Sequence, residues 1–156
     1  MGFDASKESF HILSRSRPSA GNFRVLGVNF DPKLRMAPAV FECISICNSK
    51  LQSLLRAQKF YTDADVLRLF KAHMLSFIEY RTTAIAHASP SMLDGLNDIL
   101  TRLLVRLGIS HEAALMLFNL APLEIRRDIA QLGLIHRTVL KRGPHCFKHF
   151  PRVLMP

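Results

Sequence analysis

The stretch that decides the fold reads FRVLGVNFD and runs from Phe23 to Asp31. Apolar residues alternate loosely along it, which is the pattern of a half-buried β-strand. We predict one strand through Phe30, in which Gly27 forms a bulge or a point of close backbone approach. A second strand, predicted over residues 8–13, would pair with it to form a hairpin. Two strands alone are marginally stable in water, so we expect this ribbon to pack against another sheet or against helices.

Most of the following chain has apolar residues at helical spacing, which predicts a bundle of four or five helices. Pro38 suits the first turn of a helix that ends near Gln58. Thr62, with Asp65 three residues later, forms the N-cap pattern of a long helix that runs to about Ala88.

Three further helices are predicted in the second half of the chain. The cleanest amphipathic pattern begins at Leu93 and is closed by Gly108, a typical helix stop. Ser110 begins a shorter helix through Leu117. The last helix opens at Pro122 and ends at the Gly143-Pro144 pair. We expect its apolar stripe to face the bundle core, and this stripe comprises Ile125, Ile129, Leu132, Ile135 and Val139.

These elements predict an α+β fold that is mostly α. We divide the chain into a β ribbon over residues 1–34, a helical bundle over 35–144 and a loose tail over 145–156.

The composition favours a polyanionic partner. The 156 residues are 49% hydrophobic, and Lys plus Arg number 21 against 12 Asp plus Glu, a formal net charge of +9. Such an excess favours nucleic acid first and an anionic membrane surface second, although a basic protein without such a ligand has the same composition. The longest uncharged run that is mostly apolar, residues 113–123, is far shorter than the ~20 apolar residues of a membrane span. The N-terminus lacks the pattern of a signal peptide.

Three cysteines, an odd number, argue against a disulfide framework and for a reducing, intracellular location, without separating nucleus from cytoplasm. Cys43 and Cys47 lie one helical turn apart among apolar residues, which indicates buried thiols. The alternative is a zinc site that adds His145, Cys146 and His149, but their spacing matches no usual zinc pattern.

Several short motifs follow one another along the chain. They are ASKE at 5–8, FRVLGVNFD at 23–31, KL at 33–34, KL at 50–51, LFKAH at 69–73, IEY at 78–80 and LEIRRD at 123–128, followed by Leu132 and Leu134. In this order, over about residues 3 to 150, they resemble the region that follows the catalytic palm motif in reverse transcriptases of non-LTR (LINE-type) retrotransposons. The Leu-Gly-Val element, followed by an acidic residue and Lys-Leu, is the most specific part.

This resemblance implies a division of roles along the chain. The strand pair around Leu-Gly-Val would be the primer grip, formed here by Phe23, Arg24, Val25, Leu26, Gly27 and Val28. The helices after it would form the thumb, which packs along an RNA template paired with a DNA primer. The remaining partner would be the palm and fingers portion of the parent polymerase. Met1 would then be an internal methionine of a longer reading frame, or a start used after truncation.

Polymerase chemistry needs carboxylates that hold two Mg²⁺ ions. The family carries them on an aromatic-x-Asp-Asp turn and an earlier strand, whereas this chain has no adjacent acidic pair. We therefore predict no enzymatic activity, no metal site and no cofactor in this chain, with Mg²⁺ only in the missing palm. Asp63 and Asp65 suit a helix cap, and Asp94 and Asp98 a solvated face. The contiguous Ser110-His111-Glu112 cannot form a catalytic triad, and the absence of other catalytic motifs disfavours an independent enzyme.

Clustered cations are the candidate nucleic-acid contacts outside the grip. Arg102 and Arg106 lie one turn apart, opposite a leucine stripe, and the acid-free stretch after Asp128 contributes Arg137, Lys141 and Arg142. Such side chains contact phosphates without reading bases, so binding should weaken with salt. For each one alone, a solvated surface cation is the competing interpretation. The rival to the whole hypothesis is a helical protein-interaction module, or a decayed relic, that binds no nucleic acid.

Overall fold

The computed structural model describes residues 11–14, 16 and 21–140. Its sheet consists of two short antiparallel strands, β1 (Phe23–Val25) and β2 (Val28–Phe30), which pair Phe23 with Phe30 and Val25 with Val28. Leu26 and Gly27 join the strands with φ values of 48° and 76°. Two positive φ values at the centre of a two-residue hairpin are typical of a type I′ turn, whose twist matches that of the strands.

The prediction of a single strand over residues 23–30 was therefore wrong. The chain reverses direction at Leu26-Gly27, where glycine takes up the positive φ without steric cost, so Gly27 lies in a turn and not at a bulge. The predicted pairing with residues 8–13 is also not found. Residues 11–13 form no strand, and residues 8–10 lie outside the described part of the chain.

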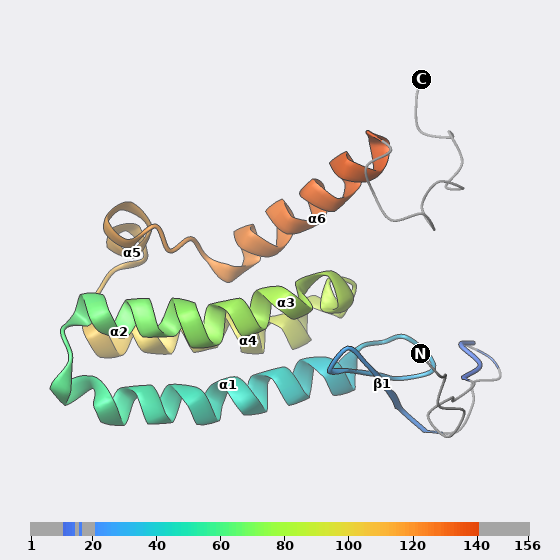
Figure 1. Ribbon diagram of the computed structural model, residues 1–156, viewed down its shortest axis with the longest axis horizontal. Helices are drawn as coiled ribbons and strands as arrows, with labels where there is room; N and C mark the ends of the chain where they lie inside the picture. Colours follow the sequence, from blue (N-terminus) through green and yellow to red (C-terminus); the bar gives the residue numbers. More distant parts are fainter. Residues whose placement is uncertain (1–10, 15, 17–20, 141–156) are drawn as a thin grey trace, which may run out of the picture.

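A short connection leads from the ribbon into the first helix. The Asp31 carboxylate accepts hydrogen bonds from the backbone N–H groups of Arg35 and Met36, at 3.1 and 2.8 Å. Helix α1 then spans Ala37–Ala57, with Pro38 in its first turn as predicted, and the 3-10 turn η2 (Gln58–Phe60) extends it. Figure 1 shows the ribbon at the N-terminal end of α1.

The long second helix was predicted correctly, together with its cap. It consists of α2 (Asp63–Phe70), a π-helical turn η3 (Lys71–Leu75) and α3 (Ser76–Ile85), which follow one another as one rod (Figure 1). The Thr62 hydroxyl accepts a hydrogen bond from the Asp65 N–H at 3.3 Å and donates one to the Asp65 carboxylate at 2.6 Å. Its apolar stripe is largely buried, and the buried members are Leu67, Phe70, Met74, Ile78 and Ile85.

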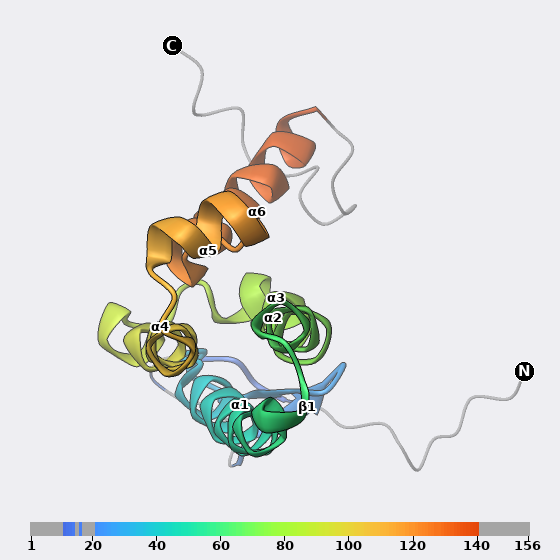
Figure 2. The same ribbon diagram turned by 90° about the vertical axis from the view of Figure 1, so that its left-hand side faces the viewer.

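Helix α4 (Pro90–Leu107) completes a three-helix core with α1 and the α2–α3 rod (Figure 2). The leucines of its amphipathic pattern, Leu93, Leu96, Leu100 and Leu103, are buried, and Gly108 ends the helix with φ 67°, as expected. A Cβ on Gly95 would lie 2.8 Å from Cδ1 of Ile44, so α1 and α4 approach closely at this point. Further along, Arg102 contacts Asn48 and Arg106 lies beside Leu55, so the two helices run in the same direction.

Two helices follow, α5 (His111–Phe118) and α6 (Leu123–Val139). The Ser110 hydroxyl caps α5 by accepting a hydrogen bond from the Ala113 N–H at 3.1 Å, which confirms the predicted start. Helix α6 packs against α3 and α4, on the side of the core away from α1, and extends away from the bundle (Figures 1 and 2). The predicted end at 143–144 and the tail lie outside the described residues.

The prediction that the apolar stripe of α6 faces inward was wrong. The side chains of Ile125, Ile129, Leu132, Ile135 and Val139 are 49–65% exposed. The opposite face meets the bundle through Leu123 and Arg127, which are both buried. Arg126 forms an ion pair with Glu79 of α3, and Arg127 donates a hydrogen bond to Asn97 of α4 at 3.0 Å. These polar contacts fix the rotation of α6 and leave its stripe outside.

The fold class is confirmed as α+β and mostly α, with the N-terminal ribbon followed by helices. Val28 is buried and Phe30 packs against the core, so the ribbon shares one hydrophobic core with the helices.

Candidate nucleic-acid interface

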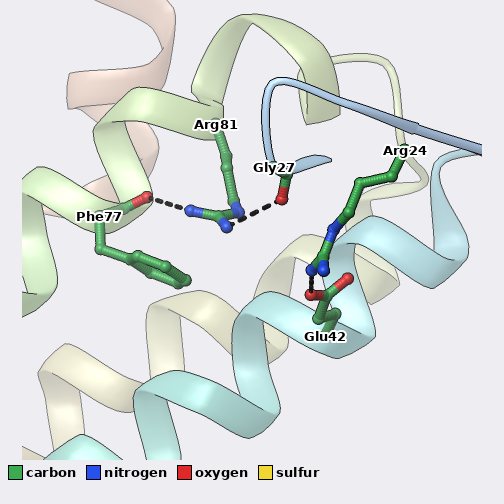
Figure 3. A network of polar contacts seen from close by, with 5 residues as sticks. All are labelled: Arg24, Gly27, Glu42, Phe77 and Arg81. Atoms are coloured by element: carbon green, nitrogen blue, oxygen red, sulfur yellow. Dashed lines mark hydrogen bonds and ion pairs between the residues drawn. The ribbon is translucent and has the colours of Figure 1, made fainter. Parts of the chain in front are cut away.

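The turn of the ribbon, which belongs to the predicted primer grip, is exposed, and its backbone is hydrogen-bonded to α3. Leu26 is 81% exposed at its tip, while its carbonyl oxygen accepts a hydrogen bond from the Tyr80 hydroxyl at 2.9 Å. The neighbouring carbonyl oxygen of Gly27 accepts one from Arg81 at 3.2 Å (Figure 3). Helix α3 therefore pins both turn residues through their backbone and leaves the Leu26 side chain free for contact.

Arg81 holds the turn in place and was missed by the sequence interpretation. It is 8% exposed, and its guanidinium lies 3.7 Å from the centroid of the Phe77 ring while also donating to the Phe77 carbonyl oxygen at 3.3 Å. No carboxylate of the described residues forms an ion pair with it. Its position one turn after Phe77, on the buried side of an amphipathic helix, was the available signal, because a cation there needs specific partners.

Arg24 is placed beside the ribbon but is already engaged. Its guanidinium forms an ion pair with Glu42 of α1, while 61% of its side chain remains exposed (Figure 3). A phosphate at this point would therefore compete with a carboxylate for the same donor groups. The ion pair also ties β1 to α1, so Arg24 has a structural part in holding the ribbon.

The remaining grip residues divide between surface and core. Phe23 stacks between His11 and Phe30, with ring centroids 4.5 and 5.5 Å away. Val25 is exposed beside the turn, whereas Val28 is buried and faces the core. Val28 is thus positioned to support the ribbon and not to touch a ligand.

Arg102 and Arg106 lie together on α4, exposed as predicted. With Thr101 and Val105, they line a shallow hollow whose other wall is Leu55 of α1. Arg102 donates hydrogen bonds to the Asn48 side-chain oxygen and to the Asp98 carbonyl oxygen, the latter at 3.3 Å. Within the described part of the chain neither arginine has an ion-pair partner.

The ribbon lies at the N-terminal end of α1, whereas this arginine pair lies beside the middle and the C-terminal half of that helix, next to Asn48 and Leu55. Glu42, which binds Arg24, and Leu55, which lines the hollow, are separated by about 20 Å along a helix that rises ~1.5 Å per residue. Between them α1 exposes small or polar side chains about one turn apart, namely Ser45, Ser49 and Gln52. Glu42 is the only acidic residue of α1. This outer face could follow about six base-pair steps of a duplex at ~3.4 Å per step.

Arg137 is not brought to this face. It is exposed near the C-terminal end of α6, which packs on α3 and α4 on the side of the core away from α1 (Figure 2). Lys141 and Arg142, predicted with it, lie outside the described residues. The predicted cations therefore occupy separate surfaces.

The acidic residues have the roles of caps and surface groups. Asp65 accepts from Thr62 and pairs with Arg68, and Asp94 and Asp98 are exposed. Hydrogen bonds from Thr62, together with the nearby Arg68, hold the pKa of the Asp65 carboxyl below its ordinary value. Among the described residues, no group of three or more His, Cys, Asp or Glu side chains is arranged to hold a metal ion. Cys146 and its neighbouring histidines lie outside that part.

No protein-family model matches this sequence, and no curated protein or solved structure matches it either. In the part of the chain that the structure describes, no helix combines the length and apolar character needed to cross a membrane.

Proposed function

We propose that this chain is a non-catalytic, thumb-like part of a retrotransposon reverse transcriptase, which binds an RNA template paired with a DNA primer. The observation that carries the proposal is the exposed Leu26-Gly27 turn, pinned by α3 at the head of the outer face of α1. The resemblance of the Leu-Gly-Val motif to the primer grip and the net charge of +9 support the same conclusion.

In this function the duplex lies along the outer face of α1. The turn contacts the primer end, and Arg102 and Arg106 contact phosphates up to about half a helical turn of duplex further on. Such contacts position a duplex without reading its sequence. The catalytic Mg²⁺ ions belong to the palm and fingers portion of the parent polymerase, so this chain alone extends no primer. We also propose that the protein is intracellular.

Titration with an RNA–DNA hybrid at several salt concentrations tests the proposal. We expect the binding constant to fall linearly with salt on logarithmic axes. Replacing Arg102 and Arg106 together by alanine should reduce the magnitude of the slope by about 1 to 2. The matched control is Arg68→Ala, because Arg68 is exposed on α2 and paired with Asp65. Binding that does not depend on salt, or that the double variant leaves unchanged, would refute the proposal.

A protein-interaction module is the second candidate function, favoured by one observation. The apolar stripe of α6 is exposed over the length of that helix, and no described element covers it. A contiguous apolar surface of this kind usually marks a protein or membrane contact. Absence of hybrid binding at low salt, together with a protein complex formed through α6, would favour this function.

A further inference from the structure

A second hollow lies between two connections that are far apart in the sequence. Lys33, Leu34 and Arg35 line it from the connection between β2 and α1, and His87 lines it from the connection between α3 and α4. Its volume is about 460 Å³, which is within the ~300–1,000 Å³ typical of small-molecule sites. Among the described residues that line it, none is acidic. The hollow therefore offers positive charge and hydrogen-bond donors to a ligand.

The two permanent cations of this hollow are not neutralised by an ion pair. In the part of the chain that the structure describes, neither Lys33 nor Arg35 forms one. Asp31 belongs to the same connection, but its carboxylate oxygens accept hydrogen bonds from the backbone N–H groups of Arg35 and Met36, at 3.1 and 2.8 Å. Two cations that line one hollow repel each other, and an anion bound between them relieves this repulsion.

The backbone that carries these cations is held in an unusual conformation. Leu34 has a φ of 53° and Met36 a φ of 61°, in the left-handed region that residues other than glycine rarely adopt. The Leu34 N–H donates a hydrogen bond to the Asp31 carbonyl oxygen at 2.8 Å, and the Leu34 carbonyl oxygen accepts one from Nε2 of His87 at 2.9 Å. Residues with such φ values persist where surrounding contacts fix them, and they cluster at functional sites. The cations therefore extend from a backbone that is already ordered without a ligand.

The hydrogen bond to Leu34 also fixes the tautomer of His87. A carbonyl oxygen can only accept, so Nε2 of the ring carries the hydrogen. The other ring nitrogen, Nδ1, makes no hydrogen bond to a described residue. Because protonation of the ring turns Nδ1 into a donor, His87 can supply this hollow with a third positive charge.

We propose that this hollow binds a diphosphate group, either as inorganic pyrophosphate or as part of a small nucleotide. Phosphate oxygens accept strong charge-assisted hydrogen bonds from arginine, lysine and protonated histidine. Arg35 can bind two oxygens at once through its planar guanidinium, while Lys33 acts as a point charge. A diphosphate carries enough negative charge to match both cations, and the hollow is larger than one phosphate group. The site is separate from the proposed duplex contact, which uses Arg102 and Arg106 at another hollow.

Isothermal titration calorimetry of the full chain with inorganic pyrophosphate tests this site. Replacing Lys33 and Arg35 together by alanine should weaken binding by at least about tenfold, because two charge-assisted contacts are lost. The matched control replaces Arg102 and Arg106 together by alanine, which removes the same charge from another exposed surface, and it should weaken binding by less than about twofold. Equal losses in the two double variants would show that only the net charge attracts the anion and would overturn the proposal. Absence of binding to the unsubstituted chain would also overturn it.

Nuclear magnetic resonance of the unsubstituted chain locates the ligand without relying on a variant that must fold. Pyrophosphate should shift the backbone amide signals of residues 33–36 and the ring signals of His87, while those of residues 101–106 stay in place. A titration that leaves residues 33–36 and His87 unchanged would overturn the assignment.

Adenosine diphosphate distinguishes the two sources of the diphosphate group. An affinity above that of pyrophosphate assigns the site to a nucleotide, and an equal or lower affinity assigns it to the inorganic anion. Titration of the same variants with an RNA–DNA hybrid separates this site from the proposed function, because the two rest on different cations. A chain that binds no pyrophosphate, but loses hybrid affinity when Lys33 and Arg35 are replaced, would assign these cations to nucleic acid and overturn the small-ligand site.

Discussion

Arg81 donates a hydrogen bond to the carbonyl oxygen of Gly27 at 3.2 Å, and so joins α3 to a ribbon turn that lies far from it in the sequence. The same guanidinium covers the Phe77 ring and donates to the Phe77 carbonyl oxygen. One buried cation thus holds the position of the turn that the proposed function places at the primer end.

Replacing Arg81 by alanine should lower the free energy of unfolding by about 2–4 kcal/mol, because two hydrogen bonds and a ring contact are lost in a buried site. Chemical denaturation measures this change. Amide hydrogen exchange should accelerate over residues 23–30. The control, Arg68→Ala, removes an exposed cation and should change stability by less than about 1 kcal/mol. Equal effects of the two substitutions would contradict the assigned role.

Alanine should have opposite effects at Gly27 and Gly133. Gly27 has φ 76°, so a Cβ there costs about 1–2 kcal/mol although no heavy atom lies within 4 Å of it. Gly133 lies within α6 with open space around it, and alanine should stabilise that helix by about 0.5–1 kcal/mol. Thermal unfolding of both variants measures the difference. A stabilising Gly27→Ala would show that the turn has another conformation.

Removing the acceptor of Arg127 should loosen α6. Burial lowers the pKa of this guanidinium, which nevertheless stays charged at neutral pH and donates to the Asn97 side chain. Asn97→Ala leaves that donor unsatisfied and should lower the free energy of unfolding by about 1–3 kcal/mol. Thr101→Ala is the control, since its hydroxyl donates only to the Asn97 carbonyl oxygen, and it should cost less than about 0.5 kcal/mol.

The Cys47 thiol should become a source of instability at alkaline pH. Its hydrogen bond with Cys43 and its burial raise its pKa above the ordinary value of 9.0. Below pH 9.0 the thiol is protonated in both states and the full contribution to stability is present. As the pH rises above this value the unfolded state loses its proton first, so the free energy of unfolding falls. Cys47→Val should show a shallower fall above about pH 9 in denaturation curves. Identical slopes would contradict a raised pKa.

Glu42→Gln should tighten binding of an RNA–DNA hybrid if Arg24 contacts a phosphate. The substitution removes the carboxylate that now engages Arg24, while the amide keeps a similar shape. We expect a gain of about two- to fivefold in affinity at low salt, on the order of 0.5–1 kcal/mol, measured by fluorescence anisotropy. Glu42→Gln combined with Arg24→Ala should lose this gain. An unchanged affinity for the single variant would remove Arg24 from the interface.

The starts and stops of the helices could be predicted because their signals are local. Thr62 with Asp65, Ser110, and Gly108 each act within a few residues of the helix end that they form. The stripes of α2–α3 and α4 were also predicted correctly, since each has one dominant apolar face and both are covered by the core.

The sequence alone determined the mostly helical α+β fold, the helix ends and most of the core, because caps, turns and apolar periodicity act over short range. Only the tertiary structure decided that β1 pairs with β2, that Arg81 reaches Gly27, and that the stripe of α6 remains outside. The physical reason is that the face of an amphipathic helix that becomes buried depends on its neighbours. For α6, polar contacts of Arg126 and Arg127 with other helices outweigh the burial of its own apolar face.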